Sequence, residues 1–384
     1  MKKVLVIGAF GCGNKGDDAI LEGLNNVIGE RCKLIPTQGK YGKLSTFMGE
    51  ELQTLSCRMN EGFSLAVMLN LCSFFIQYMK ELKGAQIVVI GGGSLLHDLT
   101  KYNLPFFYLV QTIAKSKKVP VYYVGVGAGP IKTTKGKRLL KKMMDACEGS
   151  IIRDPVDYQL LQDIGVSNAK LSVDTAFAGN INFDNQEYVL RDNDLKQNDY
   201  VVVTACQWFD SSDFWERKNI DFEEKIDKLA RAIERLLVVS EKKVVFLPTV
   251  YHDYKLGLQL KERINNELFI VLSHEYDCRE MSCVVANSCF VFGMRMHSLI
   301  FAIRSGVPFL ATIYDGKVLH LIERLNMTES IIDFEDIDTC ILDENVRRII
   351  QKRSEYKEYL NKKSIEFRKM AIDNINDTLK ELVR

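Results

Sequence analysis

The feature that most constrains the fold of this chain is a regular alternation between short apolar runs and longer stretches with helical periodicity. Such alternation is typical of a parallel sheet whose strands are joined by crossover helices. In the first half we predict strands at residues 2–7, 86–90, 120–124 and 150–152, and helices at 17–28, 104–117, 134–147 and 155–164.

A polar stretch at residues 180–199, rich in Asn and Asp, interrupts this pattern, and a second series follows. There we predict strands at 200–205, 244–247, 269–272, 289–292 and 309–313, and helices at 222–240, 254–265, 278–286, 298–305 and 318–325. A chain of 384 residues is also too long for one ordinary core. We therefore predict an α/β fold with two Rossmann-like domains facing a central cleft, at 1–182 and 199–343, and a C-terminal helical segment at 344–384.

Charge and cysteine usage exclude several classes of protein. A net charge of +1 argues against a surface built throughout for nucleic acid. The ten cysteines form no CxxC pair and no Cys/His spacing typical of zinc, which favours reduced thiols, no metal site and a cytoplasmic location. The apolar run that follows Lys3 is too short for a signal peptide and is expected to be a buried strand.

Residues 63–79 form the longest apolar segment, but it falls short of a comfortable membrane span and contains Ser64, Asn70, Ser73 and Gln77. We expect a buried or cleft-edge helix. The alternative is peripheral contact with the inner face of the cell membrane, or a cover for an apolar acceptor.

Ligands of open α/β sheets collect at the carboxyl ends of the strands, so the residues after each predicted strand are the first candidates. After the first strand, Gly11, Gly13 and Gly16 spell GxGxxG at a helix start, where free amides attract anions. A dinucleotide site would add an acid about 20 residues later, and residues 33–38 contain none. We favour an anion-binding turn with Gly13 and Asn14, in which Asp17 either caps the helix or faces the cleft.

Two further glycine-rich turns follow the predicted strands at 86–90 and 120–124. Gly92, Gly93 and Gly127 suit a backbone pressed against a ligand. His97 is either a hydrogen-bonded structural histidine or a group that lines the site, and Asp98 follows it.

Basic residues occupy several strand ends. Arg153 could clamp a carboxylate or phosphate, or form an ion pair with Asp154 or another acid.

In the second half, Arg295 and His297 follow one predicted strand and Lys317 follows another. His252 and Asp253 come after a third strand, where they either cap the loop or join the site.

Taken together, these segments resemble the polysaccharide pyruvyl transferase family, and the motifs keep that family's order over most of the chain. The segments that carry the resemblance are 11–17, 91–98, 125–130, 153–154, 174–177, 295–297 and 314–318. The chain departs from the family pattern at Asp18, Ser94, His97 and Thr175, which bears on the identity of the acceptor.

The resemblance implies a GT-B-like fold and transfer of a pyruvyl group from phosphoenolpyruvate to a sugar of a cell-surface polysaccharide or its precursor, with formation of a ketal. It places the family's Arg-x-His element on Arg295 and His297, its upstream arginine on Arg153 and its basic residue near the last strand on Lys317. We expect His297 to act as the acid. Asp17, Asp98 and Asp253 are the candidate bases by position.

The expected partners are phosphoenolpyruvate as donor substrate and a saccharide acceptor, which is lipid-linked in one alternative, and the chemistry calls for no metal or other cofactor. The sequence also leaves a homo-oligomer open. A nucleotide-sugar glycosyltransferase of the same architecture is the main rival, and a non-catalytic sugar- or anion-binding protein of polysaccharide assembly is the second, because a fold alone does not decide between functions.

Overall fold

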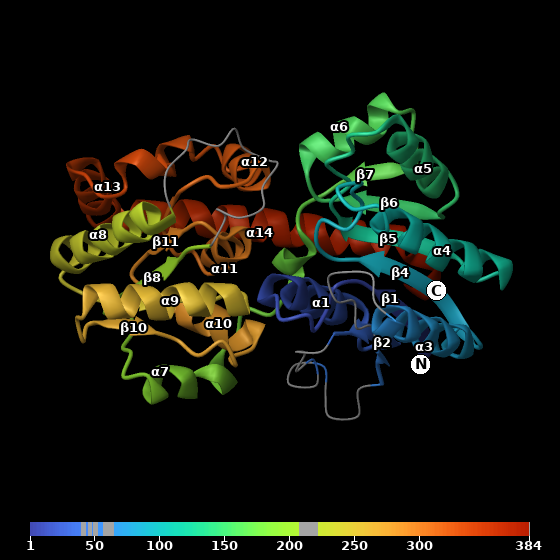
Figure 1. The fold of residues 1–384 in the computed structure, drawn as a ribbon, viewed down its shortest axis with the longest axis horizontal. Coiled ribbons are helices and arrows are strands. Elements are labelled where there is room, and N and C mark those ends of the chain that lie inside the picture. Colours follow the sequence, from blue (N-terminus) through green and yellow to red (C-terminus); the bar gives the residue numbers. More distant parts are fainter. Residues whose placement is uncertain (40–43, 45–47, 49–52, 57–64, 207–221, 384) are drawn as a thin grey trace. The chain divides into compact units, whose positions relative to one another are not determined.

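The computed structural model describes residues 1–39, 44, 48, 53–56, 65–206 and 222–383 of the chain. They divide into two compact units, which are drawn in Figure 1. Unit 1 consists of Met1–Asn180 and Phe367–Arg384, and unit 2 of Ile181–Glu366.

Unit 1 contains a parallel seven-stranded sheet in the order β3-β2-β1-β4-β5-β6-β7. Its strands are β1 (Lys2–Ile7), β2 (Cys32–Gln38), β3 (Leu55–Ser56), β4 (Ala85–Gly91), β5 (Val121–Val126), β6 (Gly149–Ile152) and β7 (Ala169–Leu171). Its helices are α1 (Lys15–Ile28), α3 (Leu65–Glu81), α4 (Asn103–Ser116), α5 (Thr134–Asp145), α6 (Pro155–Asp163) and the 3₁₀ turn η1 (Thr175–Ala178).

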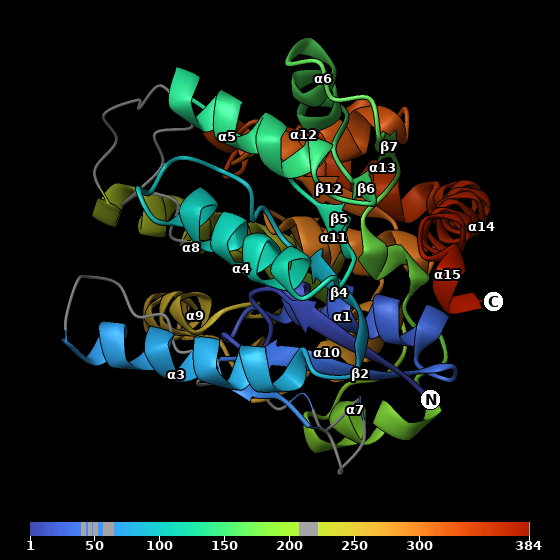
Figure 2. The ribbon, with the colours of Figure 1, turned by 90° about the vertical axis from the view of Figure 1, so that its right-hand side faces the viewer.

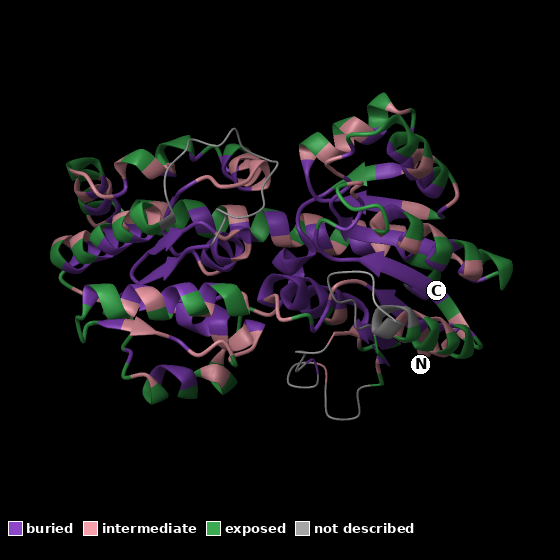
Figure 3. Ribbon diagram, in the orientation of Figure 1, coloured by how far each residue is buried: buried purple, intermediate pink, exposed green. Residues whose placement is uncertain are grey.

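Both faces of this sheet are covered by helices. Helices α3, α4 and α5 pack on one face, against alternate strand residues such as Leu5, Val88 and Tyr123 (Figure 2). Helix α1 lies on the opposite face. The crossover from β1 to β2 runs along the sheet in the opposite direction to the crossover from β4 to β5, and both are right-handed, so their helices cover opposite faces. The strands are therefore buried almost throughout, while the outer faces of the helices are exposed (Figure 3).

Unit 2 repeats this plan with a parallel five-stranded sheet in the order β10-β9-β8-β11-β12. Its strands are β8 (Tyr200–Thr204), β9 (Lys243–Phe246), β10 (Phe269–Val271), β11 (Val291–Gly293) and β12 (Phe309–Ala311). Its first helices are η2 (Asp184–Gln186), α7 (Tyr188–Asp192), α8 (Phe222–Ser240), α9 (Tyr251–Ile264) and α10 (Cys278–Ala286). Further helices are α11 (Met296–Arg304), α12 (Gly316–Arg324), η3 (Thr328–Ser330), η4 (Phe334–Asp336) and α13 (Cys340–Gln351).

The prediction of two Rossmann-like α/β units is confirmed by these strand orders. In each sheet the order reverses beside the unit's first strand, between β1 and β4 and between β8 and β11. Such a reversal opens a crevice at the carboxyl ends of the two strands, which is where doubly wound sheets bind ligands.

The last helices are α14 (Arg353–Thr378) and α15 (Lys380–Val383), and the boundary between the units falls inside α14 at residues 366/367. Residues 181–199, within the polar stretch that interrupts the alternation, carry η2 and α7, and Val189 and Leu190 of α7 are buried. This segment is therefore part of the core of unit 2.

The predicted apolar helix at 63–79 appears as α3, whose side chains Phe74 and Tyr78 are buried, whereas Ile76 is exposed. Phe63 and Ser64 lie outside the described residues. Among the residues that the structure describes, no helix combines the length and apolarity needed to cross a bilayer.

Candidate active site

The turn after β1 is built by left-handed glycines and a buried carboxylate. Gly11 and Gly13 have φ angles of 62° and 87°, a conformation that side chains with a Cβ atom rarely adopt. The Gly11 amide donates to the Asp18 carboxylate at 2.7 Å, inside the protein. The aspartate that stands where the family pattern has glutamate thus fixes the shape of this turn.

Asn14 and Asp17 form the start of α1. The Asn14 side chain accepts a hydrogen bond from the Gly16 amide at 3.0 Å and donates through Nδ2 to Asp17 at 2.9 Å. A Cβ atom on Gly93, in the turn after β4, would lie 2.8 Å from Oδ1 of Asp17. Asp17 therefore contributes to the helix start and also faces the β4 turn at the point where the strand order reverses.

The glycines after β4 make room for the first turn. Gly92 and Gly93 have φ angles of 88° and 67°. A Cβ atom on Gly92 would lie 2.8 Å from the Phe10 ring, whereas one on Gly93 would meet Asp17. Close packing between the two turns is therefore one physical reason for these glycines, and their predicted role in ligand binding stays a prediction.

Arg153 is paired inside unit 1. Its Nη1 donates to Asp174 at 2.6 Å, its Nη2 donates to the Ser94 hydroxyl at 3.1 Å, and the two charged side chains are 6% and 5% exposed. Burial acts to lower the pKa of Arg153, but the charge and hydrogen bond of Asp174, together with the charges of Asp17 and Asp157, raise it overall. The ion-pair alternative is thus observed with Asp174, and Asp154 caps α6 through the Val156 amide at 2.8 Å.

Gly127 lies between the turns after β4 and β5. Its amide donates to the Gly93 carbonyl at 2.9 Å, and a Cβ atom there would lie 3.1 Å from Asp157. Asp157 also accepts the Ala128 amide at 2.9 Å. Asp174, Asp17 and Asp157 all act to raise the pKa of the buried Arg153. The charged side chains that follow β1, β6 and β7 therefore interact with one another.

Asp98 and His97 serve a different loop. Asp98 accepts the Lys132 and Thr133 amides at 2.7 and 2.8 Å and the Thr133 hydroxyl at 2.7 Å. Burial alone would raise the pKa of Asp98, but these hydrogen bonds lower it. His97 lies 2.7 Å from Asn103, and burial lowers its pKa although Asp98 opposes the change. Both residues hold the loops that lead into α4 and α5, and no described contact joins them to Arg153.

In unit 2, Arg295 and Asp253 form a bidentate pair. Nε and Nη2 of Arg295 donate to the two carboxylate oxygens at 3.1 and 2.5 Å. Asp253 is completely buried and also accepts the Thr249 hydroxyl at 2.9 Å and the Thr249 and Val250 amides at 3.2 Å. Burial acts to lower the pKa of Arg295, but the charge and hydrogen bonds of Asp253, together with Cys206 and Tyr314, raise it overall. Asp253 therefore combines the two predicted roles, loop capping and a contact with the site arginine.

The backbone of Arg295 is fixed at the reversal between β8 and β11. The Ser298 hydroxyl lies 2.6 Å from the Arg295 carbonyl and 2.8 Å from the Thr204 hydroxyl, and Thr204 ends β8. Arg295 is the residue before α11, and its side chain makes no capping hydrogen bond to that helix. His297, half-buried, is the second residue of α11, so Arg295 and His297 lie together beside the first amides of a helix.

Lys317 lies at the start of α12, the next helix along the sheet. Asp315 caps α12 through the Lys317 amide at 3.1 Å and pairs with the Lys317 ammonium at 2.8 Å. The Tyr314 ring lies 5.9 Å from the cationic groups of both Arg295 and Lys317. The structure thus brings Arg295 and Lys317 to one aromatic ring. Tyr314 and Asp315 belong to the segment 314–318 that carries the resemblance, but they were not among the predicted site residues.

Cys206, two residues after β8, was not predicted either. Its pKa is raised to about 12, first by burial, although Arg295 opposes this, with a further increase from Asp253. A thiol in this state is not a nucleophile at neutral pH. One cysteine among ten gives no sequence signal for this position.

His252 is separated from this group. It is exposed near the start of α9, with its ring 6.5 Å from that of Tyr251. Neighbouring positions in the sequence therefore diverge: Asp253 points into the core of unit 2, and His252 points to solvent.

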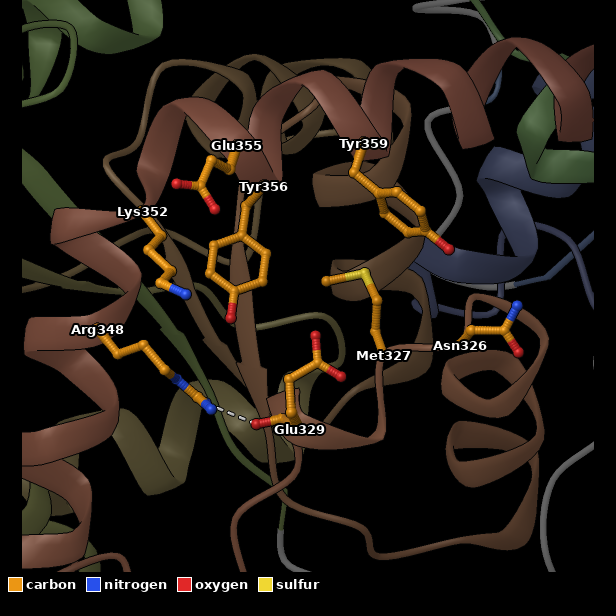
Figure 4. A pocket seen from close by; sticks show the side chains of 8 residues that line it. All are labelled: Asn326, Met327, Glu329, Arg348, Lys352, Glu355, Tyr356 and Tyr359. Atoms are coloured by element: carbon orange, nitrogen blue, oxygen red, sulfur yellow. Dashed lines mark hydrogen bonds between the residues drawn. The ribbon is translucent and has the colours of Figure 1, made fainter.

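A pocket of about 480 Å³ lies elsewhere in unit 2 and contains none of the predicted residues (Figure 4). It is lined by Asn326, Met327, Glu329, Arg348, Lys352, Glu355, Tyr356 and Tyr359. Asn326 follows the carboxyl end of α12, whereas Lys317 lies at its amino end. The pocket and the Arg295 group are thus at opposite ends of α12.

Comparison with known proteins decides the family. A model described as polysaccharide pyruvyl transferase matches residues 14–316, which is most of the chain. The chain belongs to the polysaccharide pyruvyl transferase family. Of the predicted residues, Gly13 directly precedes and Lys317 directly follows the matched region of this family member.

A relative and two solved structures extend the comparison. The amylovoran biosynthesis protein AmsJ of Erwinia amylovora is 22% identical over 375 residues, covering 87% of this chain and 89% of that protein. UDP-GlcNAc 2-epimerase from Neisseria meningitidis, bound to UDP-GlcNAc, has a TM-score of 0.63 at 11% identity, covering 99% of this chain and 100% of its own. Sucrose-phosphate synthase from Thermosynechococcus elongatus has a TM-score of 0.56 at 11% identity, covering 100% and 98%.

These likenesses confirm a GT-B-like fold for this pyruvyl transferase family member. The family match and the AmsJ relative assign it to polysaccharide modification. The roles of the individual site residues stay predictions.

Proposed function

We propose that the chain transfers the pyruvyl group of phosphoenolpyruvate to two hydroxyls of a sugar in a cell-surface polysaccharide or its precursor, forming a ketal. The observation that carries this proposal is the family match over residues 14–316. In the reaction, two C–O bonds form at C2 of the donor, a C–H bond forms at its methylene carbon, and the bond from C2 to the phosphate oxygen breaks. One hydroxyl proton ends on the new methyl group and the other on the released phosphate.

The charges around Arg295 suit this donor. Phosphoenolpyruvate carries a carboxylate and a phosphate, and bidentate guanidinium contacts and helix-start amides both bind such groups. Asp253 holds Nε and Nη2 of Arg295, and among the described residues Nη1 has no hydrogen-bond partner. We propose that Nη1, the first amides of α11 and the Lys317 ammonium bind the donor anions.

His297 is the proposed acid. Its position as the second residue of α11 places it beside the proposed anion site, where it can deliver a proton to the methylene carbon or to the departing phosphate. The Asp253 carboxylate accepts hydrogen bonds from the Thr249 amide and hydroxyl, from the Val250 amide, and from Nε and Nη2 of Arg295. We therefore propose that Asp253 is a positioning residue for Arg295. Among the three carboxylates weighed as the base, Asp17 is the one that lies at the β1/β4 strand reversal.

In unit 1, we propose that Gly13, Asn14, Gly92, Gly93 and Gly127 shape the acceptor site, because their backbones follow the ends of β1, β4 and the neighbouring strand β5.

Arg153 holds these turns in place through Asp174 and Ser94. His97, Asp98 and His252 have structural or exposed surroundings, and the proposal assigns them no step. It calls for no metal or other cofactor.

The test is an incubation of the purified chain with phosphoenolpyruvate and a panel of lipid-linked and nitrophenyl sugars, with phosphate release and product mass as readouts. A pyruvylated product is expected, and His297→Gln should lower its formation by roughly 10²- to 10⁴-fold. His274→Gln is the matched control, because His274 follows β10 and contacts Tyr251 and Tyr254 instead of the Arg295 group.

Near-normal turnover of His297→Gln would remove that residue from the chemistry. Turnover of a nucleotide sugar without any pyruvylated product would overturn the proposal in favour of a glycosyltransferase. Saturable binding of sugar or phosphoenolpyruvate without turnover of either donor would overturn it in favour of a non-catalytic binding protein.

A further inference from the structure

Helix α3 presents an apolar stripe to solvent. Leu69, Ile76 and Met79 are 59%, 65% and 44% exposed, and their spacing of seven and three residues places them on one helix face. The opposite face carries Phe74 and Tyr78, which are buried in the core of unit 1. The core of unit 1 therefore uses one face of α3, and the apolar stripe on the other face does not contribute to that core.

Helix α4 lies beside α3 and continues this surface. The ring of Phe106 on α4 lies 5.5 Å from that of Phe74 and 5.9 Å from that of Phe75, and Figures 1 and 2 both draw the two helices side by side. Leu109, on the outer face of α4, is 44% exposed. Two neighbouring helices of unit 1 thus expose aliphatic side chains.

A basic groove of about 450 Å³ adjoins the apolar stripe, where α3 and α4 end and β4 and β5 begin. Met79 belongs to both the stripe and the groove. Lys83, Lys117 and Lys118 line the groove, and its lining includes no acid. Lys80 is exposed on the last turn of α3, next to Met79.

These four lysines lack a counter-charge among the residues that the structure describes. In the part of the chain that the structure describes, none of their ammonium groups forms an ion pair or side-chain hydrogen bond. Between residues 65 and 118 the acids are Glu81 and Asp98. Glu81 pairs with Lys3 at 2.7 Å, and Asp98 binds the loop before α5.

We propose that the α3–α4 surface, defined by Leu69, Ile76, Met79, Leu109 and the four lysines, docks on an anionic lipid bilayer. The aliphatic side chains enter the boundary between headgroups and acyl chains, and the lysines bind lipid phosphates. Apolar insertion together with several lysines is the combination that gives stable peripheral binding. Charge complementarity selects this occupant over a second copy of the chain, because two such faces would bring eight unpaired lysines together.

This inference rests on the proposed function in one respect: a sugar acceptor carried on a membrane lipid gives the enzyme a reason to dock there. The docking itself depends only on unit 1. Binding to membranes and turnover of a soluble acceptor can therefore be measured separately.

The test is sedimentation of the full chain with vesicles of phosphatidylglycerol and phosphatidylcholine, compared with vesicles of phosphatidylcholine alone. Binding is expected only with the anionic lipid, and to weaken as salt rises. Lys117→Gln/Lys118→Gln should raise the lipid concentration for half-binding by about 25-fold, since each lysine near the surface contributes about fivefold. Ile76→Ser/Met79→Ser should raise it by about tenfold or more.

Matched controls come from exposed positions of unit 2. Ile365 is 70% exposed, so Ile365→Ser removes an equally exposed aliphatic side chain and should leave vesicle binding unchanged. Lys357→Gln/Lys362→Gln removes two exposed lysines and should lower binding by less than the Lys117/Lys118 pair.

Equal binding by the α3–α4 variants and the wild type would overturn the proposal. So would binding of inorganic phosphate without vesicle binding, or a dimer that Ile76→Ser dissociates in the absence of lipid. If the variants lose vesicle binding but keep full turnover of phosphoenolpyruvate with a nitrophenyl sugar, both proposals stand. If the wild type binds vesicles but does not use phosphoenolpyruvate, docking stands and the proposed function fails.

Discussion

Replacing Arg295 with methionine isolates the energetic role of its pair with the fully buried Asp253, in which the arginine side chain is itself 24% exposed. The substitution keeps an unbranched apolar side chain. It removes the positive charge and both hydrogen bonds that Arg295 donates to the completely buried Asp253 carboxylate. Removal of one partner of a buried pair costs about 3 kcal/mol or more, because the other charge stays buried. For a unit of this size about 1 kcal/mol corresponds to roughly 2–4 °C, so the unfolding midpoint should fall by about 6–12 °C.

The pair of Arg235 and Asp343 supplies the control for this measurement. It has the same bidentate geometry, at 3.0 and 2.7 Å, but the arginine side chain is 34% exposed and the aspartate 16%. Arg235→Met should therefore cost less than about 1 kcal/mol. The double variant Asp253→Asn/Arg295→Met, which removes both charges, should regain most of the stability by calorimetry while turnover stays lost. A midpoint for Arg295→Met equal to that of Arg235→Met, or no recovery in the double variant, would refute this reasoning.

The remaining predictions concern unit 1. Because the folded-state pKa of His97 is lowered from 6.5, the neutral ring stabilises the fold above pH 6.5, and that stability is lost as the pH falls through the folded-state pKa. His97→Gln should flatten the fall in thermal midpoint below pH 6.5, and an unchanged profile would contradict this. Gly125→Ala should destabilise by more than 1 kcal/mol, roughly, because φ is 64° and its Cβ would lie 2.1 Å from the Thr175 hydroxyl. Gly84→Ala should lower the free energy of unfolding by less, because Gly84 has a φ of 78° but open space around its Cβ position. Equal losses for the two variants in urea unfolding would show that the clash with Thr175 does not contribute.

The sequence predicted most strands because a strand buried on both faces is a continuous apolar run. β1 and α10 begin and end at the predicted residues. β3 and β7 were missed, since they lie at the two edges of the sheet and are short; Lys170 and Leu171 of β7 are exposed. An edge strand is defined by its hydrogen-bonded neighbour, which the local pattern does not contain.

Two helices begin earlier than predicted, because polar residues that the apolar pattern does not include lie in their first turns. α9 begins at Tyr251, three residues before the predicted start, because Asp253 accepts the amides of Thr249 and Val250 and closes the turn there. α11 begins at Met296 and so includes His297.

The site residues were predicted by type and position, whereas their partners depend on tertiary structure. The predicted neighbour of Arg153, Asp154, serves the helix that follows it, and the partner is Asp174 from another strand end. Likewise, Asp253 follows β9, Arg295 follows β11 and Tyr314 follows β12. These three residues come together only because the strands are arranged in the order β9-β8-β11-β12. A single sequence does not encode such pairings locally.

The division of α14 between the units has a consequence for synthesis of the chain. The core of unit 1 includes Phe367, Ala371, Ile375 and Leu379, and the Phe367 ring lies 5.1 Å from that of Phe177. These residues leave the ribosome after all of unit 2, roughly 10–40 s after residue 180 at about 5–20 residues per second. For that interval unit 1 has its strands but lacks their last cover, so its core stays incomplete until residues 367–379 have been synthesised.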